Sequence, residues 1–173
     1  WQKKINDLAK TEPDERSIYW FWEKEGNVGK TALTKYLCYH HDGVFLQGMT
    51  RHVLATAFKA TGCDLFIFGV PRSSDASTGV SYAALESLKD GIFHSGFGAG
   101  ATGMVLRASP HIFVFANEAP DVSKLSADKW KIIELTEYIA DAAEEAKIME
   151  EAMVASFADV QVADVQVAEV KKE

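Results

Sequence analysis

A glycine-rich turn followed by a Lys-Thr pair has the residue types and spacing best suited to chemistry in this chain. The segment Gly26-Asn27-Val28-Gly29-Lys30-Thr31 follows an apolar, strand-like stretch at 17–22 and precedes a helix predicted over 32–40. In that order, N–H groups of a tight loop and of the first helical turn converge on anionic oxygens. Lys30 is placed to reach the β- and γ-phosphates of a nucleotide, and the Thr31 hydroxyl is placed to bind Mg²⁺. The full phosphate-loop pattern has a glycine at position 24, where this chain has Lys24, so a turn without function stays open as the alternative.

A second polar position follows an apolar run. Residues 111–116 read as a buried strand, and Asn117-Glu118 come directly after it. A polar side chain at the end of such a strand can orient an attacking water or touch a γ-phosphate. The alternative is an Asn turn that only closes the strand.

Elements that would position these residues alternate along the chain. Helices are predicted over 1–9, 31–40, 50–60 and 80–89, and strands over 17–22, 44–46, 65–70, 111–116 and 131–135. Strands that alternate with helices indicate an α/β fold with a mostly parallel sheet. The glycine-rich residues 91–103 are predicted to be a mobile loop or a hairpin turn. From about 136 the sequence becomes rich in Ala, Glu and Val, which predicts a solvated helix or a disordered tail.

Composition narrows the class of protein. A chain of 173 residues with 47% hydrophobic residues suits one globular domain. No apolar stretch reaches the roughly 18–20 residues that span a bilayer, so we expect no membrane association. A chain that begins at Trp1 is expected to be a piece of a longer protein. Cys38 and Cys63 are too few and too far apart for a disulfide framework or a zinc site, so two reduced thiols are expected.

Charge is divided unevenly along the chain. Residues 1–133 hold 15 Lys/Arg and 14 Asp/Glu, whereas residues 134–173 hold 3 Lys and 11 Asp/Glu. The body is therefore near neutral and the C-terminal stretch is acidic. Bulk charge does not indicate nucleic-acid binding, although a local basic patch is compatible with it.

Blocks of sequence in a fixed order resemble a known family, and together they span residues 1 to about 135. They are Glu12-Pro13-Asp14-Glu15-Arg16-Ser17-Ile18-Tyr19-Trp20, the loop at 26–31, Val70-Pro71-Arg72-Ser73, the helix at 81–91, Pro110-His111-Ile112-Phe113-Val114-Phe115-Ala116-Asn117-Glu118-Ala119-Pro120, and Leu125-Ser126-Ala127-Asp128-Lys129-Trp130. This order resembles the ATPase region of Rep replication initiators from circular single-stranded DNA viruses, their satellites and related plasmids. The resemblance implies a superfamily 3 helicase, a three-layer, AAA+-like P-loop ATPase with a short N-terminal helix and the acidic tail.

The resemblance also implies partners and roles. ATP and Mg²⁺ are the expected cofactors, bound by residues 26–31, with Thr31 as the metal ligand and Asn117 as the family's sensor residue. The expected assembly is a homo-hexamer around single-stranded DNA, in the host nucleus for a eukaryotic virus and otherwise in the cytoplasm. The family's N-terminal nicking endonuclease is not in this chain. The predicted domains are 1–135 for the ATPase and 136–173 for the tail.

Three departures from the family pattern affect the expected site. The family's second ATPase motif ends in an acidic residue, but this chain has Gly69 at that place. Glu118 is the better-placed substitute for the missing carboxylate, and Asp75 and Glu86 are lesser candidates. Asp64 lies at the opposite end of the strand from the phosphates. The family's Asp-Arg-Trp appears as Asp128-Lys129-Trp130, so the cation that reaches a neighbouring subunit is expected to be Lys129, with Arg72 as the alternative. The family usually has a Lys in the loop after its Phe-Ser-Gly segment, where this chain has Phe97 and glycines after His94-Ser95-Gly96. The hairpin that contacts DNA is therefore expected to use Lys89, His94 or Arg107, or to be impaired. Phe97 is expected to stack on a base, with packing on a neighbouring side chain as the alternative.

Two functions are compatible with these residues. The first is an ATP-dependent DNA helicase domain of a replication initiator, acting in rolling-circle replication through positioning and electrostatic stabilisation. The second is a degenerate, integrated copy that binds nucleotide and assembles but hydrolyses weakly or not at all. A small P-loop kinase is disfavoured because no second Arg-rich lid segment is present.

Overall fold

The computed structural model describes residues 1–60, 62–71, 80–96, 100 and 102–136. Four α-helices and seven strands lie in these ranges. The helices are α1 (Gln2–Leu8), α2 (Lys30–His40), α3 (Thr50–Lys59) and α4 (Tyr82–Lys89). The strands are β1 (Ile18–Trp22), β2 (Val44–Leu46), β3 (Leu65–Gly69), β4 (Ile92–Gly96), β5 (Thr102–Leu106), β6 (His111–Ala116) and β7 (Trp130–Glu134), with short 3₁₀ turns at Val122–Lys124 and Ala127–Lys129.

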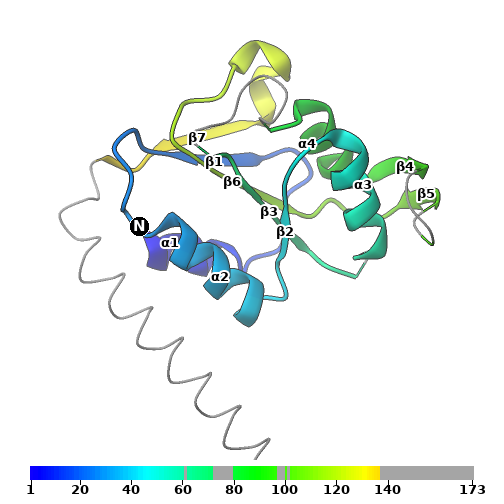
Figure 1. Cartoon of the computed structure of the whole chain (residues 1–173), viewed down its shortest axis with the longest axis horizontal. Helices are drawn as coiled ribbons and strands as arrows, with labels where there is room; N and C mark the ends of the chain where they lie inside the picture. Colours follow the sequence, from blue (N-terminus) through cyan, green and yellow to red (C-terminus); the bar gives the residue numbers. More distant parts are fainter. Residues whose placement is uncertain (61, 72–79, 97–99, 101, 137–173) are drawn as a thin grey trace, which may run out of the picture.

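The central sheet is parallel throughout, in the order β2-β3-β6-β1-β7. β6 lies between β1 and β3, and its register aligns Ala116 with Trp22 and Phe115 with Gly69. The carboxyl ends of these three strands therefore meet at one edge of the sheet (Figure 1). Continuous apolar sequence explains the central position of β3 and β6, because a strand with helices on both faces has no polar side to show to water.

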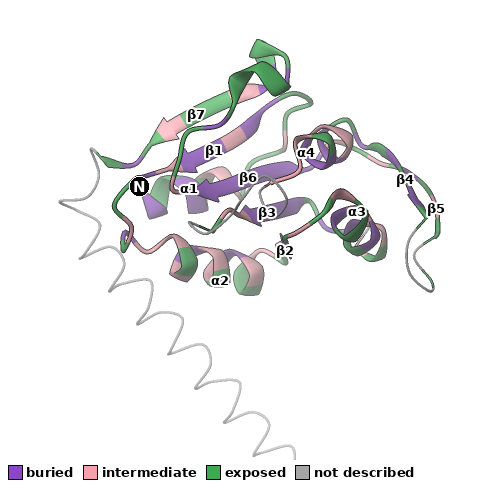
Figure 2. Ribbon diagram, turned by 45° about the horizontal axis from the view of Figure 1, so that its top comes forward, coloured by how far each residue is buried: buried purple, intermediate pink, exposed green. Residues whose placement is uncertain are grey.

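Helices cover both faces of the sheet, which gives three layers. Alternate residues of a strand point to opposite faces, so Phe21, Ile67 and Phe113 pack with α1 and α2, whereas Phe66 and Val114 pack with α3 and α4. The central strands are buried along their length in Figure 2. The predicted α/β class with a mostly parallel sheet is confirmed.

Of the two predictions for the glycine-rich segment after α4, a mobile loop or a hairpin turn, the structure supports the hairpin and adds two strands that were not predicted. β4 and β5 form an antiparallel hairpin outside the central sheet, with Ile92 opposite Leu106. Gly91 has a φ of 68°, and a Cβ there would lie 2.3 Å from the Arg107 carbonyl oxygen, so the start of the hairpin requires glycine. Glycines interrupted the alternation of polar and apolar residues and thereby concealed both strands.

Predicted element boundaries lie close to the observed ones. All five strands of the central sheet and all four helices were predicted. The largest shift is at α4, predicted from 80, which begins at Tyr82 because the Ser81 hydroxyl caps it by accepting from the Ala84 N–H. Within the described ranges, no helix has the length and apolar character needed to cross a membrane. The predicted tail lies, apart from residue 136, outside the described residues.

Candidate functional site

The loop between β1 and α2 has the backbone geometry of an anion-binding turn. Gly26, Asn27 and Gly29 have φ angles of 89°, 63° and 84°, all in the left-handed region. Such residues, interspersed with right-handed ones, turn successive N–H groups toward a common point. Gly29 is the N-cap of α2, an eleven-residue helix whose amino end adds partial positive charge. The predicted order of strand, loop and helix is therefore present.

The Lys30 ammonium lies where the ends of β1 and β6 meet. It donates to Oδ1 of Asn117 at 3.0 Å, to Oε2 of Glu23 at 3.2 Å and to the Glu23 carbonyl oxygen at 3.4 Å. Asn117 directly follows β6 and Glu23 directly follows β1, and the two strands are neighbours in the sheet. The structure thus brings two of the predicted catalytic residues, Lys30 and Asn117, into contact.

Glu23 is a buried carboxylate behind Lys30. Its side chain is 1% exposed, and its Oε1 accepts a short hydrogen bond from the Gly26 N–H. Burial alone would raise the pKa of Glu23, but the hydrogen bonds from Gly26 and Lys30 outweigh burial and hold the pKa below its usual value. Glu23 is therefore ionised at neutral pH and forms a nearly solvent-free ion pair with Lys30.

A cleft of about 1190 Å³ opens at this edge of the sheet. Its lining comes from the loop, from one side of α2 and from the ends of β2, β3 and β6. All six loop residues from Gly26 to Thr31 line it, together with Asn117. Glu25 is the one acidic residue among the described residues that line the cleft. The cleft is large enough for a nucleotide-sized ligand.

Gly69 lies at the end of β3, where the resemblance implies an acidic residue. A Cβ at Gly69 would lie 2.9 Å from two ring atoms of Phe45 on the neighbouring β2. The Phe45 ring therefore occupies the space that a side chain at this position would enter. A side chain at position 69 would therefore require the Phe45 ring to move.

The expected substitutes for the missing carboxylate lie elsewhere. Glu118 is exposed and does not line the cleft; its carbonyl oxygen accepts from the Trp20 indole N–H at 2.8 Å. Glu86 is bound to Lys129 on the α4 side of the sheet. Asp75 lies outside the described residues. Asp64 precedes β3, at the opposite end of the strand from the cleft, as predicted.

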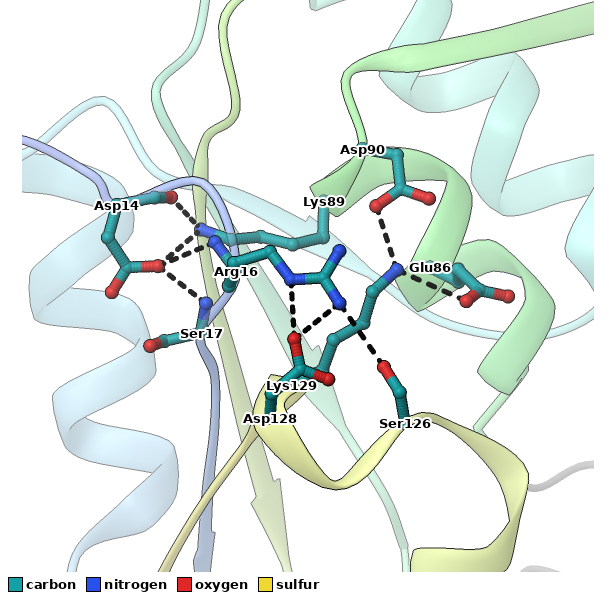
Figure 3. Close-up of polar contacts among 9 residues, drawn as sticks. All are labelled: Asp14, Arg16, Ser17, Glu86, Lys89, Asp90, Ser126, Asp128 and Lys129. Atoms are coloured by element: carbon teal, nitrogen blue, oxygen red, sulfur yellow. Dashed lines mark hydrogen bonds and ion pairs between the residues drawn. The ribbon is translucent and has the colours of Figure 1, made fainter.

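Two of the four residues predicted to contact DNA are held inside the domain. The Lys89 side chain is fully buried, and its ammonium donates to the carbonyl oxygen of Asp14 (Figure 3). The same ammonium also donates to the carbonyl oxygen of Pro110. The Arg107 side chain is 9% exposed and is paired with Asp64 at 2.9 Å. These contacts correct the predictions for Lys89 and Arg107, because both cations already have partners in their own chain. His94 is exposed on β4, and Phe97 lies outside the described residues.

The cation predicted to reach a neighbouring subunit is also held in its own chain. The Lys129 side chain is 3% exposed and donates to Asp90 at 2.7 Å and to Glu86 at 3.1 Å, as Figure 3 shows. The prediction for Lys129 is corrected for this reason: the lysine ties the segment before β7 to α4. Arg72, the alternative, lies outside the described residues.

Sequence reasoning missed two residues that support the loop. Glu23 directly follows the buried strand β1, and this place was a signal that its side chain could reach the loop, where it accepts from the Gly26 N–H. Gln2, fully buried on α1, donates to the Gly29 carbonyl oxygen at 3.4 Å. No pattern in the sequence linked Gln2 to a loop 27 residues away.

The fold and the site define an α/β domain with a glycine-containing strand–loop–helix turn and a lysine–asparagine pair at the carboxyl edge of a parallel sheet. The chain is 34% identical over 133 residues to Para-Rep C2 of subterranean clover stunt C2 alphasatellite and 33% identical over 133 residues to Para-Rep C1 of faba bean necrotic yellows C1 alphasatellite. It is 32% identical over 133 residues to Para-Rep C2 of milk vetch dwarf C2 alphasatellite. The chain is thus a relative of the Rep proteins of circular single-stranded DNA satellites, as its sequence predicted.

Each of these matches covers 77% of the chain and 46% of the relative. The chain therefore spans about half the length of the curated relatives it matches. No family model matches the chain.

Proposed function

We propose that this chain is the ATP-binding and ATP-hydrolysing domain of a Rep-type replication initiator, a superfamily 3 helicase that moves single-stranded DNA during rolling-circle replication. The observation that carries the proposal is the Lys30 ammonium, placed 3.0 Å from the Asn117 amide oxygen beside a loop with three left-handed residues. The relation to alphasatellite Rep proteins supports the role in replication. The AAA+-like class and a hexameric ring are part of the same proposal.

The donor set fits ATP with Mg²⁺. The loop N–H groups and Lys30 would hold the β- and γ-phosphates, and Thr31, which lines the cleft, would bind the metal ion through its hydroxyl. Within the described ranges, no cluster of three or more His, Cys, Asp and Glu side chains could hold a metal ion. Phosphate oxygens and water would therefore complete the coordination, which is usual for Mg²⁺. When bound, Mg²⁺ supplies charge neutralisation of the phosphates.

The residues of the chain contribute position and charge. Lys30 stabilises negative charge on the transferred phosphoryl group. Asn117 is fixed by its contact with Lys30 and by the hydrogen bond from Trp20 to the next residue, so its amide can orient the attacking water. Both roles depend on side chains that are already in position before the reaction, and neither requires Lys30 or Asn117 to transfer a proton.

A second candidate function has its own supporting observation. β3 ends in Gly69, so no carboxylate extends from the end of this strand. A domain with the loop but without this acid would bind ATP and assemble, with little turnover. This corresponds to a degenerate Rep copy that retains nucleotide binding.

ATP binding and hydrolysis, measured with and without single-stranded DNA, test both functions. Wild-type protein should hydrolyse ATP faster with DNA, and Lys30→Ala should lose at least about tenfold in ATP affinity because the buried ammonium is removed. Lys24→Ala removes the same charge from an exposed position of the loop and should stay near wild type. Binding without turnover would support the second candidate, and a wild-type protein that binds no ATP would refute both.

A further inference from the structure

Glu23 and Lys30 form an ion pair at the base of the proposed nucleotide site. The pair joins Lys30 Nζ to Glu23 Oε2 at 3.2 Å, and the two side chains are 13% and 1% exposed. Glu23 does not line the cleft, whereas Lys30 does. Any effect of Glu23 on a ligand in the cleft must therefore act through Lys30 and through its charge.

We infer that Glu23 is a positioning residue that neutralises Lys30, disfavours bare phosphate chains and thereby makes nucleotide binding depend on a divalent cation. The inference rests on the proposed function, because it concerns ATP in the same cleft. It assigns to a buried carboxylate outside the phosphate-loop pattern a role in ligand selection.

The hydrogen bonds of Lys30 support this inference. An ammonium group has three N–H donors, and Lys30 directs them to Asn117 Oδ1, Glu23 Oε2 and the Glu23 carbonyl oxygen. A phosphate oxygen that approaches Lys30 must share or displace one of these acceptors. Two of the three belong to Glu23.

Glu23 is also fixed in place. Its second carboxylate oxygen accepts from the Gly26 N–H, so the side chain is held from both sides and cannot easily turn away from an arriving anion. Charges that are excluded from water interact more strongly than solvated ones. A free triphosphate carries more negative charge than its magnesium complex, so the fixed carboxylate should penalise the free form more.

Glu15 provides a matched control outside the cleft. It is exposed and does not line the cleft, so Glu15→Gln removes the same formal charge where solvent and salt screen it. Glu23→Gln keeps the shape of the side chain, and its amide oxygen can still accept from Gly26.

Dissociation constants for ATP and adenosine, measured by calorimetry with Mg²⁺ and with EDTA, test the inference. Glu23→Gln should lower the dissociation constant of free ATP about tenfold or more and that of MgATP by a smaller factor. The dissociation constant of adenosine should not change, because only the phosphates lie near the altered charge. Glu15→Gln should change each constant less than about twofold. Thermal unfolding of each variant establishes that it is folded.

Other outcomes overturn the inference. Unchanged or weaker binding of free ATP by folded Glu23→Gln would show that the carboxylate does not oppose the phosphates. Should that variant not fold, the wild type still decides, since equal affinity for free ATP and MgATP excludes cation dependence. A wild-type protein that binds neither form refutes the proposed function instead, which distinguishes the two failures.

Discussion

Asn117 illustrates how one polar side chain acquires a fixed position at a strand end. Its amide oxygen accepts from Lys30 at 3.0 Å, and the turn that follows is held by the Trp20 indole N–H bound to the Glu118 carbonyl oxygen at 2.8 Å. Both contacts join residues that are far apart in sequence: Lys30 and Asn117 are 87 residues apart, and Trp20 and Glu118 are 98 residues apart. A side chain held in this way can act on a reacting group without reorganising first.

Replacing Asn117 by Ala should therefore reduce turnover more than binding. We expect kcat for ATP hydrolysis to fall about 10- to 100-fold and the ATP dissociation constant to change little, because the loop and Lys30 remain. Steady-state kinetics combined with equilibrium binding measure the two effects. Glu118→Ala, at the exposed neighbouring residue, should leave kcat within about twofold; a large loss there would restore Glu118 as a catalytic acid.

Gly69 offers a test of the missing carboxylate. A side chain there meets only the outer ring atoms of Phe45, whose residue is 43% exposed and has room to swing outward. Gly69→Asp should therefore lower the free energy of unfolding by no more than about 1 kcal/mol, and it should raise ATP turnover by placing an acid beside the cleft. Urea denaturation and an ATPase assay measure both. The combination with Phe45→Leu should relieve any loss of stability; a severe loss that this change does not relieve would contradict the packing account.

Stability should fall in acid in two stages. Burial lowers the pKa of His111 below 6.5, so the unfolded chain takes up a proton below that pH more readily than the folded one, and stability decreases as pH falls below about 6.5. Burial opposes the shift at Asp14, but hydrogen bonds from Ser17 and Arg16 and the nearby Lys89 lower its pKa to about 2 from 3.8. Its contribution is present above pH 3.8 and disappears as pH falls toward 2.

Urea unfolding midpoints at pH 7.5 and pH 5.5 test the first stage. The wild type should have the lower midpoint at pH 5.5. His111→Phe removes the titrating ring and should reduce the difference between the two midpoints, whatever its effect on their average. An undiminished difference in this variant would assign the acid sensitivity to other groups, such as His41, whose pKa burial also lowers.

Among the elements, those with long apolar or strictly periodic sequence were predictable and those broken by glycine were not. The β3 and β6 segments could be assigned because a run such as 65–70 is apolar without interruption. β4 and β5 could not be assigned as separate strands, because Gly96 in β4 and Gly103 in β5 interrupt the alternation of polar and apolar residues. For the site, the loop pattern gave Lys30 and the strand end gave Asn117. Glu23 and Gln2 depend on contacts across the fold, which no local pattern contains.

Two buried lysines, Lys89 and Lys129, connect α4 to segments far away in sequence. The two lysines should contribute differently to the free energy of unfolding. Lys89 donates to the buried carbonyl oxygen of Pro110 and to the part-buried carbonyl oxygen of Asp14. Lys89→Met leaves these acceptors without this donor and should reduce the free energy of unfolding by about 2–3 kcal/mol. Lys129 pairs with carboxylates whose side chains are 46% and 39% exposed and remain hydrated after its loss. Lys129→Met should therefore reduce the free energy of unfolding by about 1 kcal/mol or less.

Urea denaturation measures the free energy of unfolding of both variants, and an ATPase assay measures their turnover. Lys129→Met should keep its turnover, since the ammonium is bound within its own chain (Figure 3). If this variant unfolds like the wild type but loses hydrolysis, Lys129 does act on a neighbouring subunit. A larger stability loss for Lys129→Met than for Lys89→Met would contradict the ranking.

For the molecule as a whole, charge is separated between the domain and the rest of the chain. Both apolar clusters are built from residues 1–135, and residues 1–136 hold 15 basic and 15 acidic side chains. The net charge of −7 therefore comes from residues 137–173. An acidic stretch tethered to a neutral domain should repel the phosphates of single-stranded DNA.

A chain ending at residue 136 should bind single-stranded DNA about three- to tenfold more tightly than the full chain at 50 mM salt, because the repelling charge is removed. Fluorescence anisotropy with a labelled oligonucleotide measures the affinity, and thermal unfolding checks that the shortened chain is folded. The difference should disappear near 0.5 M salt, where screening shortens the reach of the charge to a few ångströms. A full chain in which the acidic residues of 137–173 are replaced by Gln and Asn keeps the length and should behave like the shortened one. Equal affinity of the full and shortened chains at low salt, or a difference that persists at high salt, would show that these residues act by something other than charge.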